Sequence, residues 1–216
     1  AETIMSAEAH FMRGNFVDAH IALEKAYTQI QGNGQESIAL CCDFLAQRLS
    51  ICMDIKMRNT FEERRKELLQ GHNTTWVNIF DSTCAYYYAV TGQTERIPAL
   101  FGAHMLSTVN FLAPGRPMME MIENQVFLSQ KMYAKVIGRS ETLLPVCEKM
   151  HYELVSLHVQ IQTAAAYAML GKHHDARQLL QKALGHAMPD GFLIPFVENY
   201  TYIKDVLGSI NSITPE

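Results

Sequence analysis

The sequence predicts an all-α protein with a TPR-like α-α superhelix, a solenoid built from pairs of helices. Apolar residues recur at three- and four-residue steps, as Ile161, Ala164 and Ala168 do between Gln160 and Leu170. Sustained alternation of apolar and polar residues, the signal of a β-strand, is nearly absent. Two segments at opposite ends of the chain also match one repeat template, which favours a solenoid over an irregular helical bundle.

The two matching segments begin at Gly14 and Gly171. In each, the glycine ends a first helix, and a small residue, Ala19 or Ala176, follows five positions later. A leucine comes four positions after that residue, and an alanine three positions further on. This is the pattern of the second helix of a tetratricopeptide repeat, where the first alanine lets two helices approach closely.

Weaker turns at Asn59, Gly92 and Gly138 complete a series of five helix pairs. The expected pairs span residues 1–31, 35–71, 74–107, 117–151 and 153–187, and a C-terminal capping helix follows at 195–209. In the three middle pairs, Arg64, Ile97 and Leu143 replace the small residue, which leaves their register open by one turn. We interpret residues 1–216 as a single TPR-like repeat domain and as a fragment of a longer chain.

Composition narrows the class of protein. Hydrophobic residues make up 48% of the 216 residues and charged residues 19%, below the roughly 25% of an average soluble domain. This balance excludes a disordered tail and indicates that part of the surface is apolar and covered by another surface. The 18 basic and 22 acidic residues give a net charge of −4, which disfavours direct binding of DNA by this segment.

The sequence carries no recognisable catalytic or metal-binding motif. The five cysteines have no C-x-x-C spacing, and we interpret them as small buried hydrophobes of a reducing compartment. No H-E-x-x-H motif occurs, and the adjacent His173 and His174 diverge by about 100° on a helix. We therefore expect no catalytic residues, no metal and no cofactor, and we interpret the chain as not being an enzyme.

Two further patterns bear on environment and surface. No apolar run approaches the roughly 20 residues that span a bilayer, so we expect a cytoplasmic protein without a membrane partner. The run from Glu62 to Glu67 is balanced in charge, and Glu62 and Lys66 are spaced as a favourable i,i+4 pair. We interpret this run as a solvated helix face.

The C-terminal quarter carries a more specific pattern. After the helix that ends at Leu184, the sequence reads Pro189-Asp190-Gly191-Phe192 and then Pro195-Phe196. This resembles the end of the repeat region in MalT-like regulators of the LuxR family, which are large bacterial transcriptional activators. Two departures are that Ile194 stands where the family commonly has arginine, and Asn199-Tyr200 replaces a common acidic-glycine pair.

The resemblance implies a role in transcription regulation. Members of the family join an ATP-hydrolysing module, a TPR-like sensor and a C-terminal helix-turn-helix, and the G-x-x-x-x-G-K-[ST] loop of the first module is absent from these residues. We expect a sensor that binds a small-molecule effector or a protein on its concave face and signals to ATPase and DNA-binding modules elsewhere. The alternative is a stand-alone TPR adaptor for protein–protein interaction, and a third interpretation is packing against another copy of itself as a homo-oligomer.

The concave face gives a set of candidate binding residues. In a TPR superhelix the first helix of each pair lines that face through positions three or four apart. Transferring this phase to the sequence selects Met53, Lys56, Ser82, Tyr86, Gln125, Met132, Lys135 and His158. The flexible methionines suit a surface that adapts to its ligand. The alternative is that many of these are ordinary core residues and that the register has slipped.

Overall fold

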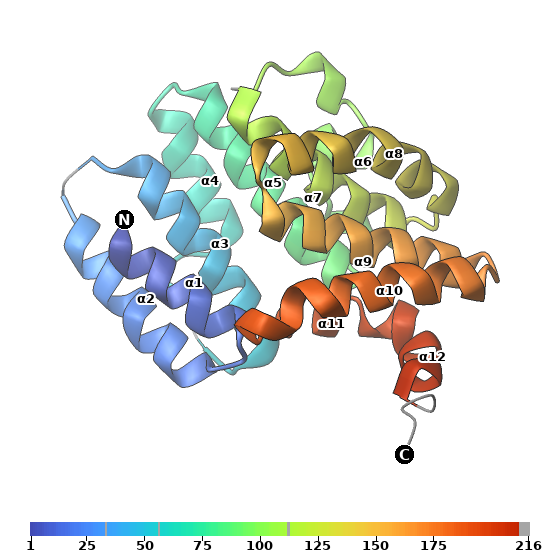
Figure 1. The fold of residues 1–216 in the computed structure, drawn as a ribbon. Coiled ribbons are helices and arrows are strands. Elements are labelled where there is room, and N and C mark those ends of the chain that lie inside the picture. The colour runs from blue at the N-terminus through green and yellow to red at the C-terminus, as the bar shows by residue number, and fades with distance from the viewer. Residues whose placement is uncertain (33, 56, 112, 212–216) are drawn as a thin grey trace. The chain divides into compact units, whose positions relative to one another are not determined.

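All regular elements in the described part of the chain are helices. The computed structural model describes residues 1–32, 34–55, 57–111 and 113–211. These residues form α-helices and short 3₁₀ turns without a β-strand, so the all-α prediction is confirmed. The helices form two compact units, Ala1–Met105 and Leu106–Glu216 (Figure 1). The finer prediction, a TPR-like superhelix, concerns how successive pairs stack and stays a prediction.

The first unit begins with a hairpin of two helices. Its elements are α1 (Glu2–Met12), α2 (Phe16–Ile30), α3 (Glu36–Cys52), α4 (Phe61–Gln70), α5 (Thr74–Val90), a 3₁₀ turn (Thr94–Arg96) and α6 (Ala99–Gly102). Between α1 and α2, Gly14 takes the left-handed conformation with φ +78°, which glycine adopts without strain. Ala7 and Ala19 are both fully buried, so the small side chains lie where the two helices meet.

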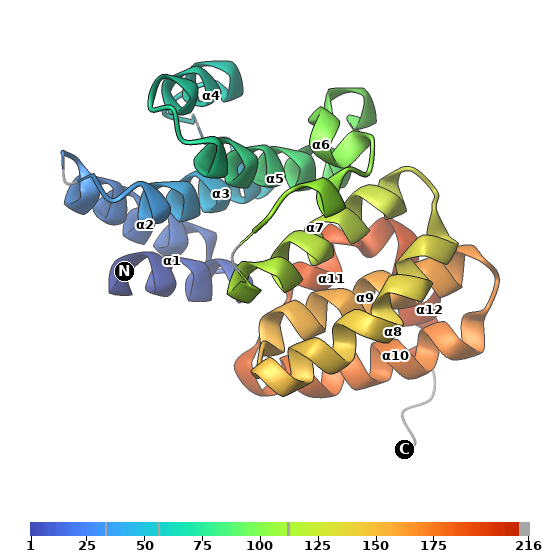
Figure 2. The same cartoon turned by 90° about the horizontal axis from the view of Figure 1, so that it is seen from above.

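The remaining helices of the first unit differ in how many residues they bury. α3 packs against α2 and α5, and it buries Leu45 and Leu49 among other residues. α4 packs against α5, but of its ten residues, all of which are described, only Leu68 is buried. Figure 2 shows α4 outside the layer that α3 and α5 form. This short, polar helix is therefore held by contacts other than an apolar stripe.

The expected third pair, residues 74–107, differs from the structure. After α5 the chain forms only a three-residue 3₁₀ turn and the four-residue helix α6, in place of a second full helix. Pro98 explains the interruption, because proline lacks the backbone N–H and disfavours helical backbone at the residue before it. Ile97 accordingly has extended backbone, with φ −62° and ψ 127°.

The second unit has an apolar core that contains several small residues. Its elements are 3₁₀ turns (Leu106–Thr108, Ala113–Gly115 and Met188–Asp190), α7 (Arg116–Ser129), α8 (Tyr133–Met150), α9 (Glu153–Met169), α10 (His173–Ala187), α11 (Ile194–Glu198) and α12 (Tyr200–Asn211). α9 packs against α7, α8, α10 and α12. Ala164, Ala176 and Ala183 are fully buried in this core, so α9 and α10 approach closely.

The C-terminal cap is two helices, whereas one helix is expected over residues 195–209. The break lies at Asn199, between α11 and α12, and its side-chain Nδ2 donates a hydrogen bond to the Pro195 carbonyl at 2.9 Å. Ile203 and Val206 of α12 join the apolar core of the second unit. Asn199, one of the departures from the family pattern, is thus a buried residue that shapes this end of the unit.

Candidate functional site

The first four residues predicted for a concave face belong to the first unit. Ser82 and Tyr86 of α5 are fully buried. The Tyr86 ring meets Phe44 edge-on at a centroid distance of 5.5 Å, which is a core contact. Met53, just after α3, is half-buried, and Lys56 lies outside the described residues. Within α5, therefore, the two predicted positions face the packed interior and do not form an open surface.

The other four belong to the second unit and also divide by burial. Gln125 and His158 are buried, whereas Met132 is half-buried and Lys135 is exposed. Gln125 donates a hydrogen bond from Nε2 to Asn199 Oδ1 at 3.1 Å, so its amide is used to hold α7 to the C-terminal helices. The two buried residues are core residues, and the predicted phase does not bring the four together on one surface.

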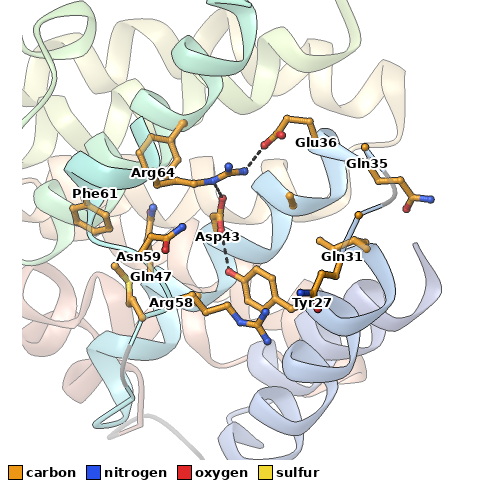
Figure 3. A pocket seen from close by; sticks show the side chains of 17 residues that line it. Tyr27, Gln31, Gln35, Glu36, Asp43, Gln47, Arg58, Asn59, Phe61 and Arg64 are labelled. Atoms are coloured by element: carbon orange, nitrogen blue, oxygen red, sulfur yellow. Dashed lines mark hydrogen bonds and ion pairs between the residues drawn. The ribbon is translucent and has the colours of Figure 1, made fainter. Parts of the chain in front are cut away.

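A cavity in the first unit offers a better candidate site. It has a volume of about 350 Å³, is open to solvent and lies between α2, α3 and the segment that leads into α4 (Figure 3). One face of α3 forms a wall through Ala39, Asp43, Ala46 and Gln47, whose spacing of four, three and one residues places them on the same side of the helix. Pockets of this size bind small molecules in other proteins.

Small and aromatic residues make the apolar part of the cavity. Ala39 and Ala46 project only a methyl group from α3, which leaves space in front of the helix. Phe61 at the start of α4 and Phe80 of α5 also line the cavity, with ring centroids 6.4 Å apart and an interplanar angle of 73°. This part of the cavity suits a flat apolar group, because aromatic edges and faces pack favourably against rings.

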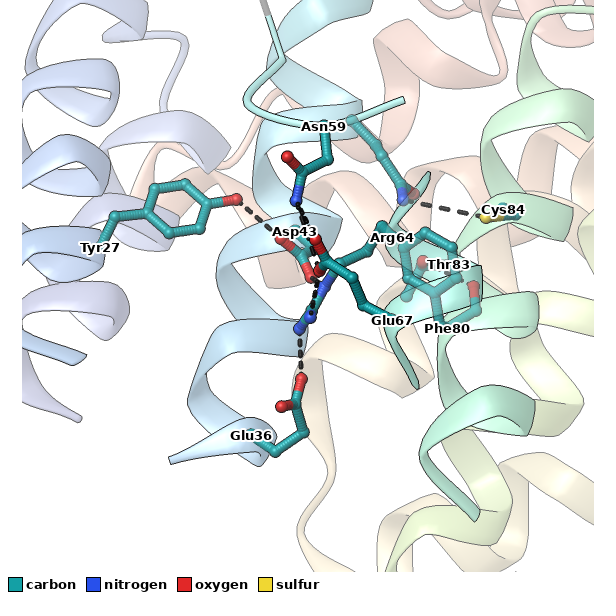
Figure 4. A network of polar contacts seen from close by, with 10 residues as sticks. Tyr27, Glu36, Asp43, Asn59, Arg64, Glu67, Phe80, Thr83 and Cys84 are labelled. Atoms are coloured by element: carbon teal, nitrogen blue, oxygen red, sulfur yellow. Dashed lines mark hydrogen bonds and ion pairs between the residues drawn. The ribbon is translucent and has the colours of Figure 1, made fainter. Parts of the chain in front are cut away.

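An arginine joins α4 to α3 at the side of the cavity. Arg64 Nε donates to Asp43 Oδ2 at 2.8 Å, and its other nitrogens pair with Glu36 and, at 3.2 Å, with Glu67. The Tyr27 hydroxyl donates to the other oxygen of Asp43 at 2.9 Å. Figure 4 shows Arg64 between Asp43 and Glu36, with Tyr27 reaching Asp43 from α2. Three helices therefore meet at one carboxylate.

Burial and ion pairing shift the pKa values of three members of this network, Tyr27, Asp43 and Arg64. Burial, and then the Asp43 carboxylate, raise the pKa of Tyr27, so its hydroxyl remains a donor. Burial raises the pKa of Asp43, while the ion pair and hydrogen bond with Arg64 oppose that rise. For Arg64, burial lowers the pKa, but Asp43 and Glu36 outweigh it and raise the pKa overall. Arg64 is therefore a permanent cation, and it pairs with Asp43, Glu36 and Glu67.

A second arginine, Arg58, lines the cavity at a solvent-exposed position. Arg58 Nη2 donates to Glu24 Oε2 at 2.7 Å, and its guanidinium lies 4.1 Å from the centroid of the Tyr27 ring. Both members of the ion pair are largely exposed, so the pair itself contributes little to stability. Its stacking on Tyr27 instead holds the segment before α4 near α2 (Figure 3).

One buried amide on the cavity wall is incompletely satisfied. Gln47 is 1% exposed, and its Oε1 accepts no hydrogen bond from any described residue. Its Nε2 makes a long contact of 4.0 Å to Cys84 Sγ. A buried carbonyl oxygen without a partner is costly, so the fold would gain if a rotation of the Gln47 side chain brought this oxygen to a hydrogen-bond donor in the cavity.

The sequence interpretation of residues 62–67 as a solvated helix face holds for five of the six residues, which are exposed, but is wrong for Arg64. The Arg64 side chain is only 14% exposed, and Arg65 makes two hydrogen bonds to Asp81, at 2.7 and 3.0 Å. The signal was present at Arg64, which occupies the position where the repeat template has a small core residue. An arginine at a core position requires a buried carboxylate partner, and Asp43 supplies it.

The remaining findings concern metal binding, membrane-spanning helices and related proteins. In the described part of the chain, no group of three or more His, Cys, Asp or Glu side chains is arranged to hold a metal ion. Among the same residues, no helix has the length and apolar character needed to cross a membrane. No protein-family model, curated protein or solved structure matches the chain significantly.

Proposed function

We propose that this chain is the sensing segment of a MalT-like regulator of the LuxR family, folded as TPR-like repeats. In this proposal the segment binds a small effector in the cavity of the first unit. It then signals to ATPase and helix-turn-helix modules that lie outside these residues, in the bacterial cytoplasm. The C-terminal sequence pattern from Pro189 to Phe196 supports the family, and the helix pairs support the repeat architecture.

The recurrence of one hairpin design in both units carries the proposal. The α1–α2 and α9–α10 hairpins each turn at a left-handed glycine, Gly14 with φ +78° and Gly171 with φ +75°. Five residues later each has a fully buried alanine, Ala19 or Ala176. Two hairpins with the same turn and the same close contact are expected when a chain is made of repeats.

Signalling would follow from differential binding. A ligand shifts an equilibrium between two conformations only by the difference in its affinity for them. The cavity is bounded by α4, whose attachment to α3 is polar, and by α2 and α3, which have apolar cores. A ligand that contacts both sides would therefore change how firmly α4 is held, and neighbouring modules could respond to that change.

The complete reading frame tests the family assignment. We expect it to encode a nucleotide-binding loop before this segment and a helix-turn-helix after it. In the full-length protein, ATP hydrolysis and promoter binding would then be measured with and without Arg64→Met, which we expect to loosen α4 because it removes the ion pairs to α3. Absence of both modules, or activities that do not respond to the variant, would overturn the proposed sensing role.

A stand-alone adaptor is the second candidate, and one observation favours it. The α1–α2 hairpin exposes three large apolar side chains, Met5, Val17 and Ile21, each more than 60% accessible. Exposed apolar residues on one hairpin are a common basis for protein–protein contact. A native reading frame close to residues 1–216 would favour the adaptor over the regulator.

A further inference from the structure

We propose that the cavity between α2, α3 and α4 takes a small uncharged molecule with a flat apolar body and an amide-type hydrogen-bonding group. The inference names the effector class of the proposed sensor, so its regulatory meaning rests on the proposed function. The binding itself depends only on residues of the first unit. Size, charge and hydrogen bonding support it separately.

The charges around the cavity disfavour an ionic ligand. Its described lining residues include two acidic and two basic side chains, Glu36, Asp43, Arg58 and Arg64. Each of the four already lies within hydrogen-bonding distance of an opposite charge. A charged ligand would lose its hydration without gaining a free counter-charge, unless it broke one of these pairs. An uncharged ligand avoids that cost.

Hydrogen bonding points to a ligand with an N–H or O–H donor. The Oε1 of Gln47 is buried on the cavity wall and accepts no hydrogen bond from the described residues. Further amides, Gln31 and Asn59, lie on the lining. A primary amide complements them, because it donates and accepts hydrogen bonds at once.

The apolar part of the cavity suits an aromatic ring. Phe61 and Phe80 contribute aromatic surface, and Ala39 and Ala46 leave the space in front of α3 open. A volume of about 350 Å³ is at the lower end of the range for small-molecule sites, so it suits a ring with one substituent better than a large ligand. An aryl amide combines the required properties.

Three probes of equal size test the charge argument directly. Benzamide, benzoate and benzamidine share one ring and differ in charge, being neutral, negative and positive at pH 7. Each would be titrated into isotopically labelled protein, with binding measured from amide chemical-shift changes. We expect benzamide to bind at least about tenfold more tightly than either charged probe, with shifts centred on α3 and α4. Equal or tighter binding of benzoate or benzamidine would overturn the proposal.

Variants locate the site and control for folding. Gln47→Met keeps the length of the side chain but removes the acceptor, and should weaken benzamide binding by about three- to tenfold. Ala39→Leu fills the half-buried rim and should abolish it. Gln70→Met, at the exposed end of α4 and away from the lining, should leave binding unchanged. Circular dichroism and the melting temperature show that each variant is folded.

The outcomes separate this inference from the proposed function. Benzamide binding that both Gln47→Met and Ala39→Leu leave unchanged would place the ligand elsewhere and overturn the inference. If benzamide binds as expected but the reading frame lacks the two modules, the proposed regulator fails and the binding site stands. If the modules are present and none of the three probes binds, the site inference fails alone.

Discussion

Five residues after the turn of the α9–α10 hairpin the chain has Ala176, whereas the equivalent position after Asn59 in the α3–α4 pair has Arg64. Ala176 is fully buried in an apolar core, and its two helices pack closely. Arg64 instead extends to carboxylates on α3, Asp43 and Glu36. At this position of the repeat, the α9–α10 pair has a close apolar contact, and the α3–α4 pair has an ion pair beside a cavity.

The two contacts also differ in what stabilises them. Close packing of alanines rests on dispersion and on the removal of apolar surface from water, which change little with ionic strength. The contact at Arg64 rests on ion pairs that are partly exposed, and it therefore weakens as salt screens the charges. We expect the α3–α4 pair to be the more easily opened of the two, as a ligand-responsive element must be.

The largest effect is expected in the apolar core of the first unit, where α3 and α5 pack together. Tyr86→Ala removes a fully buried ring that contacts Phe44, and should lower the free energy of unfolding by about 3–5 kcal/mol. Lys135→Ala, at an exposed position from the same predicted binding face, should change it by less than about 0.5 kcal/mol. Urea denaturation measures both. Similar small effects would mean that Tyr86 is a surface residue after all.

The close contact of α9 and α10 can be broken by adding volume. Ala176→Leu inserts a side chain where none fits, and should cost about 1–3 kcal/mol. Ala134→Leu, on the exposed side of α8, is the matched control and should be nearly neutral. An unchanged melting temperature for Ala176→Leu would show that the helices can separate without cost, and would remove the contrast with Arg64.

The charged contact is expected to respond differently from the apolar one. Arg64→Met leaves Asp43 without its cation and should cost about 1–2 kcal/mol, since the pair is partly solvated. Adding Asp43→Leu to this variant should recover much of the loss, because an apolar pair can replace an ion pair of similar volume. A double variant that is less stable than Arg64→Met alone would contradict this view of the contact.

Local signals account for what could be predicted from the sequence. A glycine followed five residues later by a small residue specifies a turn and a close contact within one hairpin, and the helices on either side of Gly14 and Gly171 lie within the expected ranges. Local chemistry also explains the failures at Pro98 and Asn199. Both were visible in the sequence, but a helical period does not show where a helix is interrupted.

The candidate site could not be predicted in the same way, because its parts come from three helices. Tyr27, Asp43 and Arg64 are separated by 16 and 21 residues, and their meeting depends on how α2, α3 and α4 pack. Transferring a concave-face phase selected buried residues such as Ser82, since α5 packs against both α3 and α4. Only Arg64, as a charge at a core position, pointed toward the network.

The smallest effect is expected at the start of α4. It tests whether this helix is less firmly held than α9. Thr60 and Glu63 form a capping box, in which the Thr60 hydroxyl accepts from the Glu63 N–H at 3.2 Å and the Thr60 N–H donates to the Glu63 carboxylate at 2.8 Å. Thr60→Ala should cost about 1 kcal/mol, seen as roughly fivefold faster hydrogen exchange in α4. Exchange in α9 is the internal control and should not change.

The same cap gives α4 a dependence on pH that α9 should lack. The hydrogen bonds from the Thr60 backbone and side chain lower the pKa of Glu63 below its ordinary value of 4.5. An acid with a lowered pKa in the folded state stabilises that state above its unfolded pKa, and the contribution is lost as pH falls through the folded value. Exchange in α4, corrected for its intrinsic pH dependence, should therefore accelerate on acidification below about pH 4.5. Glu63→Gln keeps an acceptor at this position but cannot titrate, so it should remove the acceleration. If the variant retains it, another carboxylate of the α3–α4 contact, with Asp43 the first to test, controls the opening of the helix.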